Sequence, residues 1–234
     1  MATLSEIVAV TRRILDDPAY TEPLIVEELN KTLQRVAAGI RMPDGGVSPP
    51  LPDLHSYGTV TTSLTLPYVS LPTDYQREVV RIYDSTGNRY EPPRGGDYYA
   101  YNLFLRQIAR MDLVEAGEIY ALCVRGTRLY YQGIPMVATT IGLHYYRKPA
   151  VLALDGDVPD GIPEHLAEDI LKHGVLKEIF GEKIEDGQDN SGIGTKYHSM
   201  KFYEVMTDLV DFIGTDGEPQ YYGSGGFEDR GVCD

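Results

Sequence analysis

The hydrophobic positions near the start of the chain recur at helical spacing in two separate runs. The first run opens with Thr3 and Glu6, which match the pattern of a capping box. The second run has Thr21 as its candidate N-cap and Gly39 directly after its last apolar position. Its apolar positions lie on one helical face: Ile25, Leu29, Leu33 and Val36. The pattern predicts a helical hairpin over residues 1–41.

The helical period ends in residues 42–58, where four prolines and three glycines favour an extended linker. From Thr59 onward, β-branched and aromatic residues alternate around turn signals, which predicts a β domain over residues 59–150. Near its end, Gly and Pro separate three strand-like runs that are close enough in sequence to predict an antiparallel meander: 118–128, 129–135 and 139–148. Residues 97–112 fit a short helix only loosely.

After Pro163 the apolar spacing is helical again. One face of the expected helix carries Leu166, Ile170, Leu171, Val175 and Ile179, and Gly181 is its predicted end. Gly174 lies inside this helix, where glycine costs about 1 kcal/mol relative to alanine unless another helix packs closely against it. A last helix is predicted from Thr195 to Ile213, with Gly214 as its C-cap.

The order of the predicted elements indicates an α+β fold. Helix pairs from the two ends of the chain, 1–41 and 151–214, can form a four-helix bundle if the β domain is inserted between them. Residues 215–234 form an extended C-terminal tail with too little aliphatic surface to offset its own ordering entropy. We therefore expect a partner, most simply a neighbouring chain, to order this tail.

The charge and the cysteines narrow the classes of function. A net charge of −14 argues against binding to nucleic acid or to an anionic membrane, since such binding needs Lys and Arg next to the phosphates. No apolar run reaches membrane-spanning length, and the amphipathic start of the chain does not resemble a signal peptide. Two cysteines, Cys123 and Cys233, make no disulfide framework, so a reducing cytoplasm is the expected place of synthesis.

Two clusters of polar residues could hold a metal ion. His165, Asp169 and His173 are spaced four apart and form a zinc-competent set, but exposed helix faces carry polar residues at the same interval, and we favour a solvated face. The acids at 155, 157 and 160 suggest a calcium loop, yet Pro159 and Asp160 occupy the fifth and sixth positions, where such a loop needs an oxygen ligand and a glycine. We assign no metal ligands and no cofactor.

No common catalytic motif is present. The sequence lacks the nucleophile-elbow, phosphate-loop, zinc-protease and dinucleotide patterns, and Cys123 lies in an apolar strand where a core position is expected. The chain has 18 tyrosines and no tryptophan, with four adjacent pairs at 98–99, 130–131, 145–146 and 221–222. Adjacent residues of a strand face opposite sides, so one tyrosine of each pair is expected in the core and the other at the surface or an interface.

Three segments of the sequence form a recognisable set. The first is a strand ending in Tyr145-Tyr146-Arg147-Lys148-Pro149, followed by an acidic loop and the helix start Ile162-Pro163-Glu164. The others are Gly117 to Pro135 and Leu64 to Asp84, which contains an LP-x-D-[YF] pattern. Together they resemble the head-to-tail adaptor (connector, tail-tubular-A-like) proteins of tailed bacteriophages. The resemblance covers about residues 1–215 and includes no catalytic residue.

The resemblance implies a structural role in the neck or tail of a virion, assembled in the host cytoplasm. Such proteins form a ring of twelve copies beneath the portal protein, contact a tail, nozzle or other neck protein, and let DNA pass through the lumen without specific binding. Their C-terminal segments grip the portal, which here suggests Tyr221, Tyr222 and Phe227 as anchors. Tyr146, Arg147 and Lys148 would then make subunit or junction contacts.

Two other functions stay open at this point. One is a different ring-forming tail component, such as a terminator or baseplate protein. The other is a metal-dependent hydrolase that would use His165, Asp169 and His173.

Overall fold

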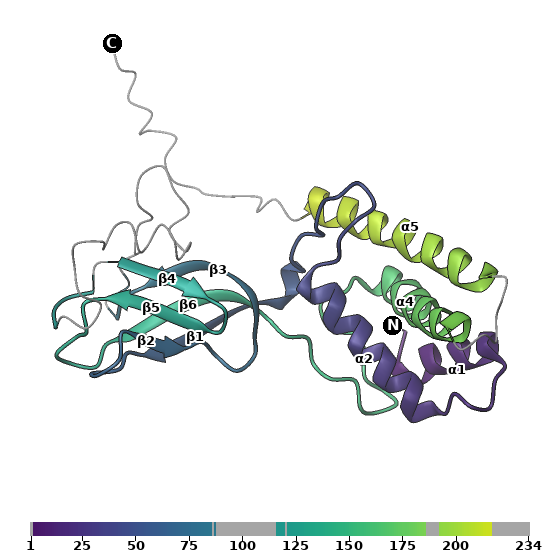
Figure 1. The fold of residues 1–234 in the computed structure, drawn as a ribbon, viewed down its shortest axis with the longest axis horizontal. Helices are drawn as coiled ribbons and strands as arrows, with labels where there is room; N and C mark the ends of the chain where they lie inside the picture. The colour runs from purple at the N-terminus through teal and green to yellow at the C-terminus, as the bar shows by residue number, and fades with distance from the viewer. Residues whose placement is uncertain (1, 86, 88–115, 120, 186–191, 217–234) are drawn as a thin grey trace, which may run out of the picture.

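The helices and the strands occupy two separate lobes (Figure 1). The computed structural model describes residues 2–85, 87, 116–119, 121–185 and 192–216. The helical lobe holds α1 (Leu4–Leu15), α2 (Glu22–Ala38), α4 (Glu164–Glu185) and α5 (Ile193–Asp216). None of the helices in these ranges is long and apolar enough to cross a membrane.

The first two helices begin at their predicted N-caps, and the second ends at the predicted glycine. The backbone N–H of Thr3 donates to Glu6 Oε2 at 2.9 Å, as expected for one half of a capping box. This hydrogen bond lowers the pKa of the Glu6 carboxyl. α2 ends at Gly39, whose φ of 99° is a conformation that glycine adopts without strain.

The two C-terminal helices are longer than predicted. α4 continues through Gly181 to Glu185, and α5 continues through Gly214 to Asp216, so the predicted helix ends were wrong. A glycine ends a helix when its backbone turns left-handed, and neither glycine has a positive φ. A tertiary contact holds the extra turn of α4, because Lys183 Nζ donates to Asp17 Oδ2 at 2.8 Å, just after α1.

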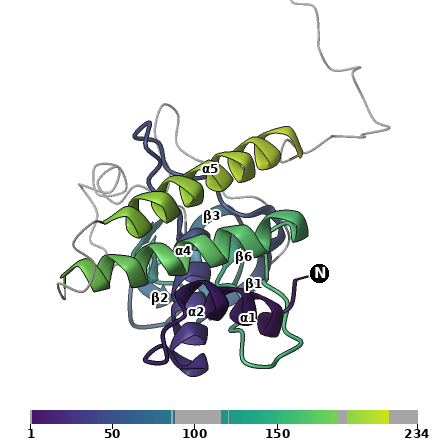
Figure 2. The same cartoon turned by 90° about the vertical axis from the view of Figure 1, so that its right-hand side faces the viewer.

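The four described helices share one hydrophobic core, and α4 lies at its centre. It contacts α1, α2 and α5, and it runs between α5 and the other two helices (Figures 1 and 2). The core includes the predicted apolar positions of α2 and α4, with Leu166 only partly buried, together with residues of α1 and α5. Gly174 lies where three helices meet: a Cβ there would be 2.4 Å from Thr32 Cγ2 of α2 and 3.1 Å from Phe202 Cε2 of α5. The close helix packing that would offset the cost of a glycine at this position is therefore present.

The described part of the β lobe contains two three-stranded antiparallel sheets. The first sheet has the order β1-β6-β3, built from His55–Thr61, Thr140–Arg147 and Tyr75–Tyr83. The second sheet has the order β2-β5-β4, built from Tyr68–Ser70, Arg128–Gln132 and Ala121–Arg125. The fold is therefore α+β, as predicted.

Two details of the β prediction were wrong. β1 already begins at His55, inside the expected linker, directly after a short 3-10 helix at Pro52–Leu54. The predicted meander does not form either, because β4 and β5 pair as a hairpin while β6 joins the other sheet, between β1 and β3. The side chains of Ile141, Leu143 and Tyr145, which alternate along β6, are all buried. The central position of β6, with a partner strand on each side, buries such a face best.

The inner faces of the two sheets form a second hydrophobic core. It combines residues of the first sheet, such as Ile82 and Leu143, with Leu122 and Leu129 of the second sheet. The alternation expected of paired tyrosines is confirmed at two sites, where Tyr131 and Tyr145 are buried and their neighbours Tyr130 and Tyr146 are half-buried. The pairs at 98–99 and 221–222, and the ambiguous segment 97–112, lie outside the described residues.

Candidate functional site

The connection from β6 to α4 is fixed by a bidentate ion pair. Arg147 Nη1 donates to Asp160 Oδ2 at 2.6 Å, and Arg147 Nη2 donates to Asp160 Oδ1 at 3.2 Å. The same carboxylate also accepts the backbone N–H of Ala150 at 3.0 Å. Burial alone would raise the pKa of Asp160, but Arg147 and Ala150 outweigh it and leave the pKa below its usual value. The hydrogen bond to Asp160 raises the pKa of Arg147.

The backbone of the rest of the connection is held by hydrogen bonds to two polar side chains. Asn30 of α2 acts like a strand partner, accepting the N–H of Leu152 at 2.8 Å and donating to its carbonyl at 2.9 Å. Asp157 Oδ2 accepts the N–H groups of Ala153 and Leu154 at 2.7 and 2.8 Å. These two hydrogen bonds lower the pKa of Asp157. The loop is therefore ordered along its length by polar contacts, and its acids serve these contacts.

The loop also completes the first turn of α1. The N–H of Leu4 donates to the carbonyl of Asp157 at 2.8 Å, and the N–H of Ser5 donates to the carbonyl of Asp155 at 3.2 Å. The first N–H groups of a helix have no partner within the helix, so these carbonyls satisfy donors that would otherwise need water. As a result, β6, the loop, α1 and α2 form one connected unit.

A second contact between the lobes comes from β3. Glu78 has a φ of 49° within a stretch of shifted register, typical of a β-bulge, and the neighbouring Arg77 reaches the helical lobe. Arg77 Nη1 donates to the carbonyl of Ser48 at 3.3 Å, next to Gly39 at the end of α2. A Cβ at Gly39 would lie 2.4 Å from Arg77 Nη1, so the end of Arg77 would have to move, and the φ of 99° itself favours glycine at this position.

The three residues expected at a junction or subunit contact all lie at the boundary of the lobes. Tyr146 packs against the helical core, and Arg147 binds Asp160 as described above. The backbone N–H of Lys148 donates to the carbonyl of Asp74 at 2.6 Å, and its Nζ donates to the carbonyl of Thr73 at 3.1 Å. The tail residues Tyr221, Tyr222 and Phe227 lie outside the described part of the chain.

We expect Asp160→Asn to lower the free energy of unfolding by about 1–2 kcal/mol, because it removes the charge from a bidentate pair. Urea unfolding at neutral pH measures the change. The matched control is Asp155→Asn, since the side chain of Asp155 is exposed and its structural contact is made by its backbone carbonyl. Equal stability of the two variants would show that the ion pair does not fix the junction.

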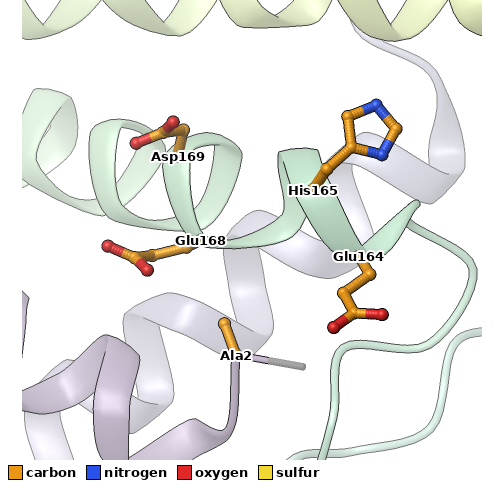
Figure 3. Close-up of a pocket in the computed structure, with 5 residues that line it drawn as sticks. All are labelled: Ala2, Glu164, His165, Glu168 and Asp169. Atoms are coloured by element: carbon orange, nitrogen blue, oxygen red, sulfur yellow. The ribbon is translucent and has the colours of Figure 1, made fainter.

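The structure does not bring His165, Asp169 and His173 together as ligands. His165 and Asp169 line a pocket of about 500 Å³ with Ala2, Glu164 and Glu168. Figure 3 shows that His165 and Asp169 point to one side while Glu164 and Glu168 point to the other. His173 instead faces α5, where its Nδ1 lies 2.9 Å from Nδ1 of His198. Within the described ranges, no group of three or more His, Cys, Asp or Glu side chains could hold a metal ion.

Cys123 has the character of a core residue. Its side chain is fully buried and unpaired, and burial raises the pKa of its thiol to about 12. A thiol with such a pKa is almost entirely protonated at neutral pH and is a poor nucleophile. The sequence-based interpretation is confirmed.

A surface that the sequence analysis missed lies on the outer face of the first sheet. His144 is at its centre, with ring centroids of His55, Tyr57 and Tyr83 at 5.2, 5.1 and 5.6 Å. Tyr146 packs edge-on against His55, and Arg81 is the register partner of His144. We call this set the platform: His55, Tyr57, Arg81, Tyr83, His144 and Tyr146. The sequence did carry a signal for this surface. Each of the three strands has two His, Tyr or Arg residues spaced two apart, and residues at this spacing lie on the same face of a strand.

Comparison with known protein families gives one match over nearly the whole chain. The family described as SU10 adaptor protein matches residues 2–224. The chain belongs to the SU10 adaptor family. This is a family of phage head-tail adaptors, so the resemblance seen in the sequence is confirmed.

Membership of the SU10 adaptor family sets the broad class of function. The family is structural and is not a family of enzymes, and an adaptor acts by contact with other components of a virion. No curated protein matches the chain. The charged junction of this SU10 adaptor therefore has a structural interpretation. The ion pair of Arg147 and Asp160 holds the two lobes together, and it is not interpreted as part of an active site.

Proposed function

We propose that this SU10 adaptor forms a ring beneath the portal of a phage, joins the portal to the tail and lines the DNA channel. The match of the family over residues 2–224 is the observation that carries the proposal. The ring would contain about twelve copies, on the resemblance to other head-to-tail adaptors.

The organisation of the chain supports this role. Helices from both ends of the chain share one core, consistent with a four-helix bundle over 1–41 and 151–214 with a β domain inserted at 59–150. The fixed junction between the lobes suits a part that must keep its shape under the load of a packed head. A net charge of −14 per copy would repel DNA from the walls of a lumen and let it pass without adhesion.

The tail is the proposed connection to the portal. α5 extends to Asp216, so the tail begins two residues later than the sequence suggested. Glycines at 223, 225 and 226 separate the adjacent pair Tyr221 and Tyr222 from Phe227. Aromatic side chains on such a pliable strap can anchor in pockets of a partner. Tyr146, Arg147 and Lys148 would support the connection indirectly, by fixing the lobe boundary from which neighbouring subunits are contacted.

Removing residues 217–234 should leave a folded protein that no longer attaches to portal rings. The prediction follows because the described helices and sheets bury their cores without the tail, whereas the proposed anchors lie within it. Purified full-length and shortened chains are mixed with portal rings of the same phage and imaged by electron microscopy. Circular dichroism of the shortened chain provides the control for folding.

A triple variant, Tyr221→Ala with Tyr222→Ala and Phe227→Ala, separates the aromatic anchors from the length of the tail. Loss of portal attachment in both variants supports the strap. Attachment by the shortened chain would contradict it, and failure of the full-length chain to attach to portal would favour a tail terminator or baseplate protein instead.

A further inference from the structure

The platform on the first sheet is rigid as well as exposed. The ring of Tyr57 lies over Gly142, where an added Cβ would be 2.7 Å from the Tyr57 hydroxyl. An aromatic ring that covers a glycine on a neighbouring strand gains contact with the backbone and is held in place. The ring of His144 then contacts three other rings, from β1 and β3, so the platform is ordered before any partner arrives.

The platform has the composition of a protein interface. Tyr57 is 58% exposed, and His55 and Arg81 are also exposed. Tyrosine and arginine are enriched at interfaces, and rigid rings lose little conformational entropy when a partner covers them. Burial, with the nearby His55 and Arg81, lowers the pKa of His144, so its ring is neutral at pH 7 and Arg81 supplies the charge.

A second surface of the same chain exposes apolar and acidic side chains. The loop at residues 150–158, which we call the display loop, exposes Val151 and Leu154 to 65% and 71% and also exposes Asp155. Asn30 holds the backbone of this loop at Leu152, and Asp157 holds the N–H groups of Ala153 and Leu154. Apolar side chains this exposed on a fixed backbone are typical of a surface that another molecule covers.

The charges of the two lobes favour contact between unlike surfaces. In the described part of the helical lobe, which includes the display loop, acidic residues outnumber basic ones by roughly two to one. In the described part of the β lobe, which includes the platform, Lys and Arg outnumber Asp and Glu. Two copies that meet through like lobes would bring like charges together, whereas a head-to-tail contact pairs opposite ones.

We propose that the platform of one copy binds the display loop of a second copy, with Tyr57 and His144 against Val151 and Leu154 and with Arg81 near Asp155. The proposal rests on the proposed function, since unlike surfaces that bind head to tail produce a closed ring when the rotation closes. DNA is the poorer occupant, because Arg81 is the cation of the platform and the whole chain carries −14.

The test measures self-assembly of the full-length chain by native mass spectrometry and light scattering. Arg81→Glu and Tyr57→Ala should each weaken assembly about 10-fold or more, and the wild-type assembly should weaken as salt is raised. Arg128→Glu is the matched control, since it makes the same change of charge in the same lobe but on the second sheet, where Arg128 lies over the ring of Tyr68. This control should assemble like the wild type.

Reversing the charges on both surfaces identifies the occupant. Asp155→Arg alone should weaken assembly, and its combination with Arg81→Glu should restore a large part of it. Assembly of Arg81→Glu at the wild-type level, or a double variant no better than either single one, would overturn the pairing. The pairing would also be overturned if the wild type bound single-stranded DNA and Arg81→Glu abolished that binding. If the wild type formed a ring that attaches to portal, and Arg81→Glu did the same, the proposed function would stay intact and only this interface would be refuted.

Discussion

Gly174→Ala is expected to destabilise the chain, although alanine is the better helix former. The added Cβ would lie 2.4 Å from Thr32 Cγ2 and 3.1 Å from Phe202 Cε2, and both of these side chains are buried. Overpacking of this kind costs about 1–3 kcal/mol, against a gain of about 1 kcal/mol in helix propensity. We therefore expect a net loss of up to about 2 kcal/mol in the free energy of unfolding, measured with urea, and a larger loss for Gly174→Val.

The same helix provides the control. Gly181 also lies inside α4, but nothing lies within 4 Å of the position its Cβ would occupy. Gly181→Ala should therefore stabilise the chain by about 0.5–1 kcal/mol. Thr32→Ser removes the methyl group that the new Cβ would meet, so it should recover part of the loss caused by Gly174→Ala. If Gly174→Ala proved as stable as Gly181→Ala, the three helices would not meet at this point.

The helices were predictable because their signals are local. Thr3 with Glu6, and Gly39, mark a start and an end that depend only on neighbouring residues. Gly181 carries the same local signal as Gly39 but does not end its helix. The difference lies in a contact across more than 160 residues of sequence, from Lys183 to Asp17, which no local pattern contains.

The strands show the same limit more clearly. The sequence predicted a strand over residues 139–148, and β6 forms there at Thr140–Arg147, but its partners are β1 and β3, both far away in sequence. The missed platform depends on that pairing, because His55, Tyr83 and His144 meet only when all three strands lie side by side. The sequence showed that an acidic loop connects the last strand to the next helix, whereas its partners Asn30 and the N-terminus of α1 were not predictable from its own residues.

The stability of the chain is expected to fall between pH 6.5 and pH 4 because of a buried pair of histidines. His173 of α4 and His198 of α5 are both buried, and their Nδ1 atoms are 2.9 Å apart, so one ring donates and the other accepts. The ring of Phe180 stacks on His198 at a centroid distance of 5.3 Å and an interplanar angle of 7°. A proton added to the accepting ring would break this hydrogen bond, because both Nδ1 atoms would then carry a hydrogen, and it would place a positive charge in a buried position.

The sign of the pH dependence follows from the pKa values. Burial, followed by the charge of His173, lowers the pKa of His198 to about 4, and burial lowers that of His173. Histidines of the unfolded chain titrate near 6.5 and therefore bind protons that the folded chain does not bind. The stability from this pair is complete above pH 6.5 and is lost as the pH falls through the folded-state values. The loss is roughly 2–3 kcal/mol for His198.

Urea unfolding at a series of pH values measures this loss, and His198→Asn tests its origin. Asparagine can place an oxygen or nitrogen near the position of Nδ1 without titrating, so the variant should lose most of the slope between pH 6.5 and pH 4. Lys172 and Lys201 nearby oppose protonation of His173, while Asp169 and Glu204 favour it. His165→Asn is the control, because His165 is exposed and its loss should leave the slope unchanged. An unchanged slope in His198→Asn would show that other groups govern the acid sensitivity of the helical lobe.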